Sequence, residues 1–395
     1  MLRVGTHSTR LSASNQEAEL PYLYSKPESW NKFSPSRFLY EFITQKRHRV
    51  HSLDNNRKIA MDCKALIYQI GKQQVIAPIY PNYLVKWDIS QEPRIIQQIE
   101  LPYKFEPVPS IVLLPDGERF AVTPSEVTPE FGIEIRHWDD LSVLQTVQLP
   151  HAPYGETSLE DEYHGHQKCT HISWLGVTPC QRYLLIAEGW GDMYLVNLET
   201  GEQVRWLCRW RDYNAGFAMD AQMQFLIINS VDMDEFHHVF RIGDMLRGEL
   251  SYLGEFAGGA RCHRGGLGFS PDGESLAYSF YIYNRVELAC LQVDRQFLAS
   301  LNDFVEQPLE TKWQQPWMLH HGHDSFNPWQ SEIVWLDNQR LVFGVGKTLA
   351  LVQAETGEVE ATYNLDAVMN GMKFDPISGK MIVATKEGIG VVTIG

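Results

Sequence analysis

A recurring pair of short apolar segments joined by a tight turn is the feature that most restricts how this chain can fold. The clearest copy spans 267–278 and reads LGFSPDGESLAY, a second spans 111–122, and a third with a longer turn spans 371–384. Proline presets φ at the start of such a turn, and glycine accepts the positive φ that a tight hairpin requires. Each copy therefore predicts a β-hairpin.

A second repeated element sets the period of the pattern. The sequence Glu-Thr-Gly-Glu occurs at 199–202 and again at 355–358, so the copies are 355 − 199 = 156 residues apart. This distance corresponds to three units of about 52 residues, and a propeller blade takes about 40 to 50 residues for four strands. From about residue 58 onward the chain reads as short β-type runs separated by Gly, Pro, Asn and Asp,.

The repeats resemble those of WD-repeat proteins. Gly165-His166 and Gly322-His323 each open a unit that ends at Glu-Thr-Gly. Two Trp-Asp pairs stand where that family has its name-giving pair: Trp87-Asp88 and Trp138-Asp139. Two further units carry degraded pairs: Val196-Asn197 and Phe240-Arg241. The resemblance covers about residues 58–395 and implies blades arranged in a ring,.

We therefore predict an all-β fold, a seven-bladed β-propeller, with six or eight blades as the alternatives. The expected blades lie at 58–100, 108–150, 168–208, 214–255, 263–310, 330–362 and 368–395. Residues 1–34 are expected to form a polar extension and 35–395 a single propeller, with long loops at 151–167 and 311–330. The last blade lacks a fourth strand, and Phe38–Ile43 is expected to supply it from the N-terminal side, hiding two sheet edges,.

Several motifs suggest chemistry but fit structural roles better. Gly344–Thr348 lacks the further glycine and the following helix of a phosphate-binding loop, so a hairpin turn is expected,. Ser270 lies between two strands instead of at a strand-to-helix elbow,. The acidic run 232–235 lacks the glycine of a calcium loop, since position 237 is histidine,.

Two histidine clusters are the remaining metal candidates. The first contains His164, His166, Cys169 and His171, and the second contains His320, His321, His323 and Asp324. These residue types can bind zinc, but neither spacing matches a compact zinc signature. The WD-repeat resemblance implies a structural role for His166 and His323, with Asp192 as a hydrogen-bond partner of His166. We expect no catalytic residues, no metal and no cofactor.

Composition narrows the classes of partner and the compartment. The formal balance is 34 − 49 = −15, which disfavours nucleic acid and anionic membranes as partners,. No uncharged apolar run is long enough for a membrane helix,. The six cysteines are widely spaced and contain no Cys-x-x-Cys pair, which favours free thiols in a reducing compartment,. A soluble, acidic, cytoplasmic protein is expected.

These observations predict a non-enzymatic interaction platform that binds a protein or peptide. In a propeller, connections between second and third strands and between successive blades share one rim, which we call the loop-rich face. Aromatic and arginine side chains dominate interface hot spots. The residues of these types expected on that face are Trp190, Arg211, Tyr213, Arg261, His263, Arg264 and Trp317, with Trp313 nearby. The alternative is an enzyme or small-ligand binder that acts at the central channel through the 164–171 cluster.

Overall fold

The computed structural model describes most of the chain from residue 65 onward. The described residues are 48–49, 65–105, 110–124, 132–149, 172–188, 192–200, 205–209, 214–222, 224–230, 236–245, 251–257, 266–282, 285–302, 304–305, 309–317 and 331–394. The chain divides into two units, Met1–Gln45 and Lys46–Gly395, and every described residue lies in the second. None of the described helices is long and apolar enough to cross a membrane.

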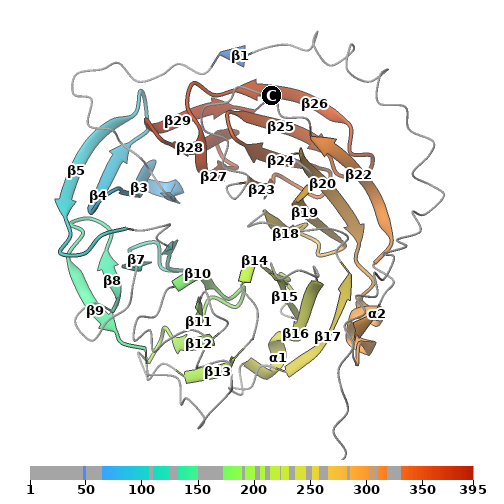
Figure 1. The fold of residues 1–395 in the computed structure, drawn as a ribbon. Coiled ribbons are helices and arrows are strands. Elements are labelled where there is room, and N and C mark those ends of the chain that lie inside the picture. Colours follow the sequence, from blue (N-terminus) through green and yellow to red (C-terminus); the bar gives the residue numbers. More distant parts are fainter. Residues whose placement is uncertain are drawn as a thin grey trace, which may run out of the picture. The chain divides into compact units, whose positions relative to one another are not determined.

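Seven small antiparallel sheets form a ring, which confirms the predicted all-β, seven-bladed propeller (Figure 1). The first blade consists of β2 (Ile67–Gln69), β3 (Gln74–Ile79), β4 (Tyr83–Asp88) and β5 (Arg94–Glu100). The second consists of β6 (Ile111–Leu113), β7 (Arg119–Val122), β8 (Ile133–His137) and β9 (Val143–Val147). The third consists of β10 (Ile172–Val177), β11 (Tyr183–Glu188), β12 (Asp192–Asn197) and β13 (Arg205–Arg209).

The fourth and fifth blades share an insertion. The fourth contains β14 (Asn214–Met219), β15 (Phe225–Ser230), β16 (Phe236–Arg241) and β17 (Ser251–Ala257), with helix α1 (Ile242–Met245) after β16. The fifth contains β18 (Leu267–Phe269), β19 (Ser275–Ile282), β20 (Arg285–Gln292) and β22 (Thr311–Trp317). Between β20 and β22 the chain forms helix α2 (Arg295–Ser300) and β21 (Phe304–Val305), and β21 pairs in parallel with β17.

This insertion corrects the prediction of a long loop over 311–330. Residues 311–317 form the fourth strand of blade five and pair along β20. The predicted blade ended at residue 310, before this strand, because the sequence pattern did not indicate that a helix separates the third strand from the fourth. Residues 318–330, like the predicted loop 151–167, lie outside the described residues.

The last two blades complete the ring. The sixth contains β23 (Ser331–Trp335), β24 (Arg340–Val345), β25 (Thr348–Gln353) and β26 (Val359–Asn364), and β1 (His48–Arg49) pairs in parallel with β26. The seventh has three described strands: β27 (Met369–Asp375), β28 (Lys380–Thr385) and β29 (Gly388–Thr393). The predicted closing strand Phe38–Ile43 and the boundary at residue 34 lie outside the described residues.

Closure of the ring also rests on packing between the first and last blades. One apolar cluster contains Leu66, Val75 and Trp87 from blade one together with Ile382 and Ile389 from blade seven. The second and third strands of a blade are nearly continuous apolar runs because both faces of each blade are covered by neighbouring blades,. The fourth strands lie on the outside of the ring and are far more exposed.

The hairpin turns form as predicted. Gly117 and Gly273 adopt φ values of 69° and 71°, and each donates its backbone N–H to the residue that begins its turn. Ser270 is a buried turn residue whose hydroxyl hydrogen bonds to Asp272 at 2.6 Å. Gly346 and Lys347 form the turn of the β24–β25 hairpin, with Val345 opposite Thr348, so this segment continues as a strand and does not start a helix.

Candidate interaction surfaces

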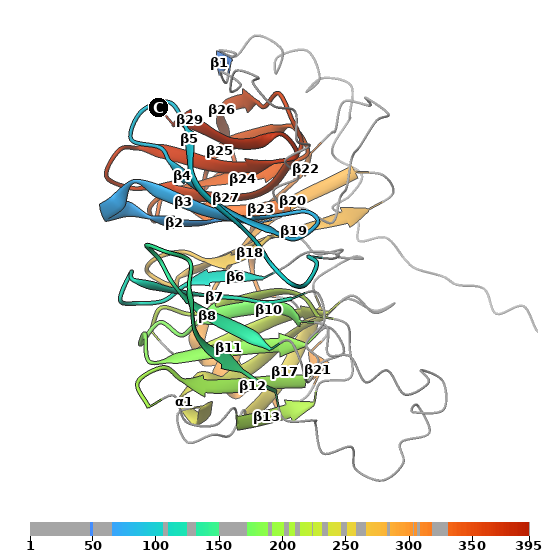
Figure 2. The same ribbon diagram turned by 90° about the vertical axis from the view of Figure 1, so that its left-hand side faces the viewer.

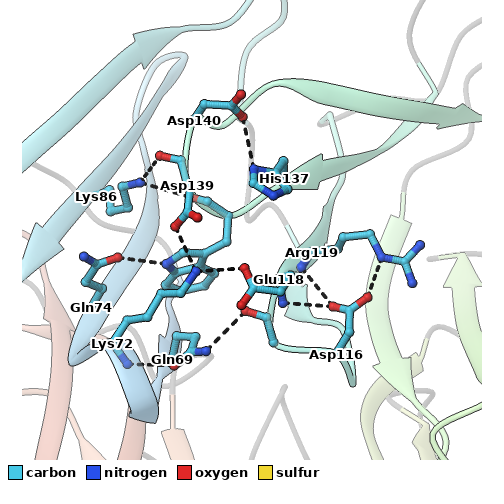
Figure 3. A network of polar contacts seen from close by, with 12 residues as sticks. Gln69, Lys72, Gln74, Lys86, Asp116, Glu118, Arg119, His137, Asp139 and Asp140 are labelled. Carbon is cyan, nitrogen blue, oxygen red and sulfur yellow. Dashed lines mark hydrogen bonds and ion pairs between the residues drawn. The ribbon is translucent and has the colours of Figure 1, made fainter.

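A polar network joins blades one and two on what we call the turn face, the rim that carries the first-to-second and third-to-fourth strand connections (Figure 3). Lys72 ends the short 3-10 helix η3 (Ile70–Lys72) between β2 and β3. Its Nζ lies 2.8 Å from Glu118 Oε2 and 2.8 Å from Asp139 Oδ1, both in turns of blade two. Figure 2 shows η3 and these turns on the same side of the ring.

Electrostatics make Lys72 the centre of this network. Hydrogen bonds to Asp139 and Glu118 raise the pKa of the Lys72 ammonium. Reciprocally, the hydrogen bond from Lys72 lowers the pKa of the Asp139 carboxyl. Because these groups are largely solvent-exposed, the pairs contribute little individually to stability. Their main effect is to hold the turns of two blades at a defined distance.

A second lysine, Lys86 of β4, supports the same turn from the interior. It is buried, and its Nζ donates to the backbone carbonyls of Trp138, at 3.0 Å, and of Asp139. Burial lowers the pKa of Lys86. The Trp138 indole in turn donates to Gln74 Oε1 at 2.9 Å. Blade one therefore binds the Trp138-Asp139 turn in two ways, through the backbone carbonyls of the turn and through the Trp138 indole.

One group of metal-type ligands comes together among the described residues. Ligand atoms of Glu118, His137 and Asp139 lie within 4.8 Å of one another. The Lys72 ammonium already contacts both carboxylates of this group. A divalent ion would have to displace that lysine, so the donor set fits an ion-pair network between blades better than a metal centre.

The strand registers correct the placement of one Trp-Asp pair. Asp88 is the last residue of β4 and pairs with Gln74, the first residue of β3. The corresponding residue of blade two is His137, which pairs with Arg119, and Asn197 and Arg241 hold this position in blades three and four. Trp138-Asp139 lies two residues later, in the turn after the strand. Trp87-Asp88 therefore matches the repeat position, and Trp138-Asp139 does not.

Most of the predicted anchors lie outside the described residues: Trp190, Arg211, Tyr213, Arg261, His263 and Arg264. The same holds for both histidine clusters and for the acidic run 232–235. Trp317 is described as the last residue of β22, opposite Val286, so it belongs to a strand end and not to a long loop.

Trp313, predicted beside that face, has a structural role instead. It lies in β22, it is buried, and its Nε1 donates to the carbonyl of Ala354 at 2.7 Å. A Cβ added at Gly357 would meet the Trp313 ring at 2.7 Å. The second Glu-Thr-Gly copy therefore places its glycine where the indole of the preceding blade packs.

The sequence reading missed an apolar surface on the outer strands of blades one and two. Ile95 and Ile96 of β5 and Val143 and Leu144 of β9 are all exposed. Apolar runs in this chain usually indicate buried strands, and no local signal distinguishes an outer strand from an inner one. Only the count of strands within each unit could have indicated that these residues lie at an edge.

The architecture defines the chain as a seven-bladed β-propeller. No protein-family model and no curated protein matches the chain. The resemblance to WD-repeat proteins therefore rests on the repeat pattern and on the shared propeller architecture.

Proposed function

We propose that this propeller is a non-enzymatic interaction platform that binds a protein or peptide partner on its loop-rich face. A rigid ring with long connections on one rim can present binding side chains without moving. Sparse, widely spaced cysteines support a cytoplasmic location for it, and Cys180 and Cys290 are free thiols,.

The registers of the described strands support the gathering of the anchors on one face. In blade three, Ile172 pairs with Glu188, and Asp192 pairs with Arg209, so these four strand ends lie at the same rim. In blade five, Trp317 pairs with Val286 at the corresponding rim. The connections that carry Trp190, Arg211 and Arg264 begin and end at strand ends of this kind. They would therefore share the loop-rich face.

The single observation that carries the proposal is the contrast with the turn face. There, some described cations bind the neighbouring blade: Lys72 binds Glu118 and Asp139, and Arg295 binds Asp220. Charges used for interblade pairing cannot also recognise a partner without breaking the ring contacts. We therefore assign recognition to the opposite rim.

Affinity purification with mass spectrometry tests this assignment. Trp190→Ala and Arg264→Ala, separately and together, should reduce the recovery of specific cellular partners, because truncating an aromatic or arginine anchor removes much of an interface's free energy. Arg182→Ala, an exposed arginine in a turn of blade three, is the matched control and should leave recovery unchanged. Unfolding temperatures should be equal for all variants. Unchanged recovery with both anchors removed would contradict the proposal, and stoichiometric zinc in the purified protein would favour the central-channel alternative.

A further inference from the structure

The fourth strands of five blades carry a β-bulge at the same register. In blade one, Trp87 pairs with Ile95 while Lys86 pairs with Gln97, which leaves Ile96 as the extra residue. In blades two, four, five and six the pairing shifts at the same place, between the third-last and second-last residues of the third strand. The extra residues are Ile96, Leu144, Leu253, Lys312 and Glu360. In a regular strand, successive side chains alternate between the two faces. A bulge interrupts this alternation and turns the extra side chain outward.

The bulges differ in chemistry around the ring. In blades one and two they expose Ile95 (44%), Ile96 (41%), Val143 (46%) and Leu144 (53%). In blades five and six the equivalent residues are charged and already bound, since Lys312 pairs with Glu355 and Glu360 accepts from Gln353. We call the two adjacent exposed residues of β5, Ile95 and Ile96, the rim patch. Contiguous exposed apolar side chains on a soluble protein indicate a binding surface.

Blade one carries the rim patch, and blade two carries Val143 and Leu144 on the next outer strand. Strands β5 and β9 follow one another on the outer rim in Figure 1. Gln97, next to Ile96, donates from Nε2 to the carbonyl of Asp140 at 2.9 Å, and Asp140 lies in the turn just before β9. This contact lies on the face of β5 towards blade two, whereas Ile95 pairs with Trp87, which packs against blade seven, so the rim patch belongs to β5 alone.

The chain itself shows that its outer strands accept an added strand. β1 pairs in parallel with Tyr363 and Asn364 of β26, and β21 pairs in parallel with Glu255 and Phe256 of β17. In both cases pairing starts beyond the bulge, where the strand is regular again. Gln98–Glu100 is the equivalent part of β5, and β5 is the last strand of its sheet among the described residues.

Two residue types that protect a sheet edge, lysine and proline, are missing from the regular part of β5,. The outer strand β22 contains both Lys312 and Pro316, two residue types that discourage strand addition,. Between Ile95 and Glu100, β5 has neither a lysine nor a proline. The charges around it are acidic: Glu92, Glu100 and Asp140 are exposed, whereas Arg94 is bound to Asp88 at 2.8 Å.

We propose that the outer edge of β5 binds an extended segment of a partner protein as an added parallel strand, with apolar side chains of that segment on the rim patch and basic side chains beside Glu92, Glu100 and Asp140. Main-chain hydrogen bonds supply affinity in this mode, and alternate side chains supply specificity. The net charge of −15 also favours a basic segment,. This surface is separate from the loop-rich face, so it stands or falls independently of the proposed function.

The test uses a short fluorescein-labelled peptide of alternating lysine and valine, with fluorescence anisotropy as the readout. This peptide should bind the full chain. Two control peptides should not bind: one in which glutamate replaces lysine, and one of the same composition in which the lysines and the valines form two separate blocks. A version N-methylated at alternate residues should also fail, since it cannot form the ladder on that side. Equal binding of the N-methylated or block peptide overturns strand addition.

Point variants locate the binding. Ile96→Asn keeps the net charge and should weaken binding of the peptide by on the order of tenfold, the loss expected for an apolar contact of about 1.4 kcal/mol. Ile377→Asn, at an exposed apolar residue in a turn of blade seven, is the matched control and should bind normally. Trp190→Ala and Arg264→Ala should also bind normally, which separates this result from the loop-rich face. Unchanged binding by Ile96→Asn overturns the proposal. Dimers of the parent protein in analytical ultracentrifugation that disappear in Ile96→Asn also overturn it, because the patch would then bind a second copy of the chain.

Discussion

The Tyr68 hydroxyl donates a 2.9 Å hydrogen bond to Oδ2 of Asp375 across a sequence separation of 307 residues. Tyr68 lies in the innermost strand of blade one and Asp375 ends the innermost strand of blade seven. Burial alone would raise the pKa of Asp375, but hydrogen bonds from Ser378 and Tyr68 outweigh it and lower that pKa. This bond therefore joins the two ends of the ring, beside the apolar cluster that the same blades share.

Removing this hydroxyl should weaken ring closure. Tyr68→Phe is expected to lower the free energy of unfolding by about 1 kcal/mol, the usual net value of such a hydrogen bond. The loss is somewhat larger if the buried Asp375 carboxylate finds no other donor. Urea denaturation measures this. Tyr83→Phe, at a ring packed against the same cluster, is the control and should change stability less. Equal effects of both substitutions would show that the hydroxyl of Tyr68 does not matter for closure.

The glycine of the second Glu-Thr-Gly copy should be less replaceable than another turn glycine. Gly357 and Gly379 have similar positive φ values, 75° and 65°, so alanine is strained at both,. At Gly357 the new Cβ would also meet the Trp313 ring at 2.7 Å, whereas at Gly379 the nearest atom is at 4.0 Å. We expect Gly379→Ala to cost about 1 kcal/mol and Gly357→Ala roughly 2 to 4 kcal/mol. Thermal unfolding compares the two, and similar losses would argue against the contact with Trp313.

Removing Lys72 should create a weak metal site. Lys72→Ala leaves the carboxylates of Glu118 and Asp139 without their counter-charge beside His137. Carboxylate and imidazole groups at this spacing are zinc ligands. Isothermal titration calorimetry with zinc chloride should show one added site in Lys72→Ala relative to the parent protein. The double substitution Lys72→Ala, Asp139→Asn should lose it, and zinc binding that is the same with and without Lys72 would contradict this account.

His237 should make the fold sensitive to acid. Its ring is fully buried against Phe256 and Tyr278, and both ring nitrogens are without a hydrogen-bond partner among the described residues. Burial, with a smaller contribution from His238, lowers the pKa of His237 from 6.5 to about 3. The unfolded chain therefore binds a proton below pH 6.5 that the folded chain excludes, so stability is lost as pH falls from 6.5 towards 3.

The substitution His237→Phe tests this sensitivity. The variant should lose stability less steeply than the parent below pH 6.5, by roughly 1 kcal/mol per pH unit, because one proton-linked group has been removed. Urea denaturation at several pH values between about 7 and 4 gives the slopes. Parallel curves for the two proteins would show that His237 does not control acid stability.

The local part of the fold could be read from the sequence because its causes are local. Pro115–Gly117 and Pro271–Gly273 specify hairpin turns through their own φ preferences, and the same reasoning rejected a phosphate loop at Gly344–Thr348,. Strand β22 was missed because helix α2 lengthens its unit and because Pro316 is uncommon inside strands,. Trp138 was misplaced because a shift of two residues within a repeat is visible only from strand pairing.

By itself the sequence determined that hairpins recur at a regular spacing and close into blades, since turn chemistry and apolar runs act over a few residues. The tertiary structure decided which side chains the ring buries. Lys86 is enclosed between blades, while Ile96 is exposed on an outer strand, although composition alone would suggest the reverse. The reason is that burial in a propeller depends on a strand's rank in its blade and on the bulge register, and both are set by pairing between distant segments.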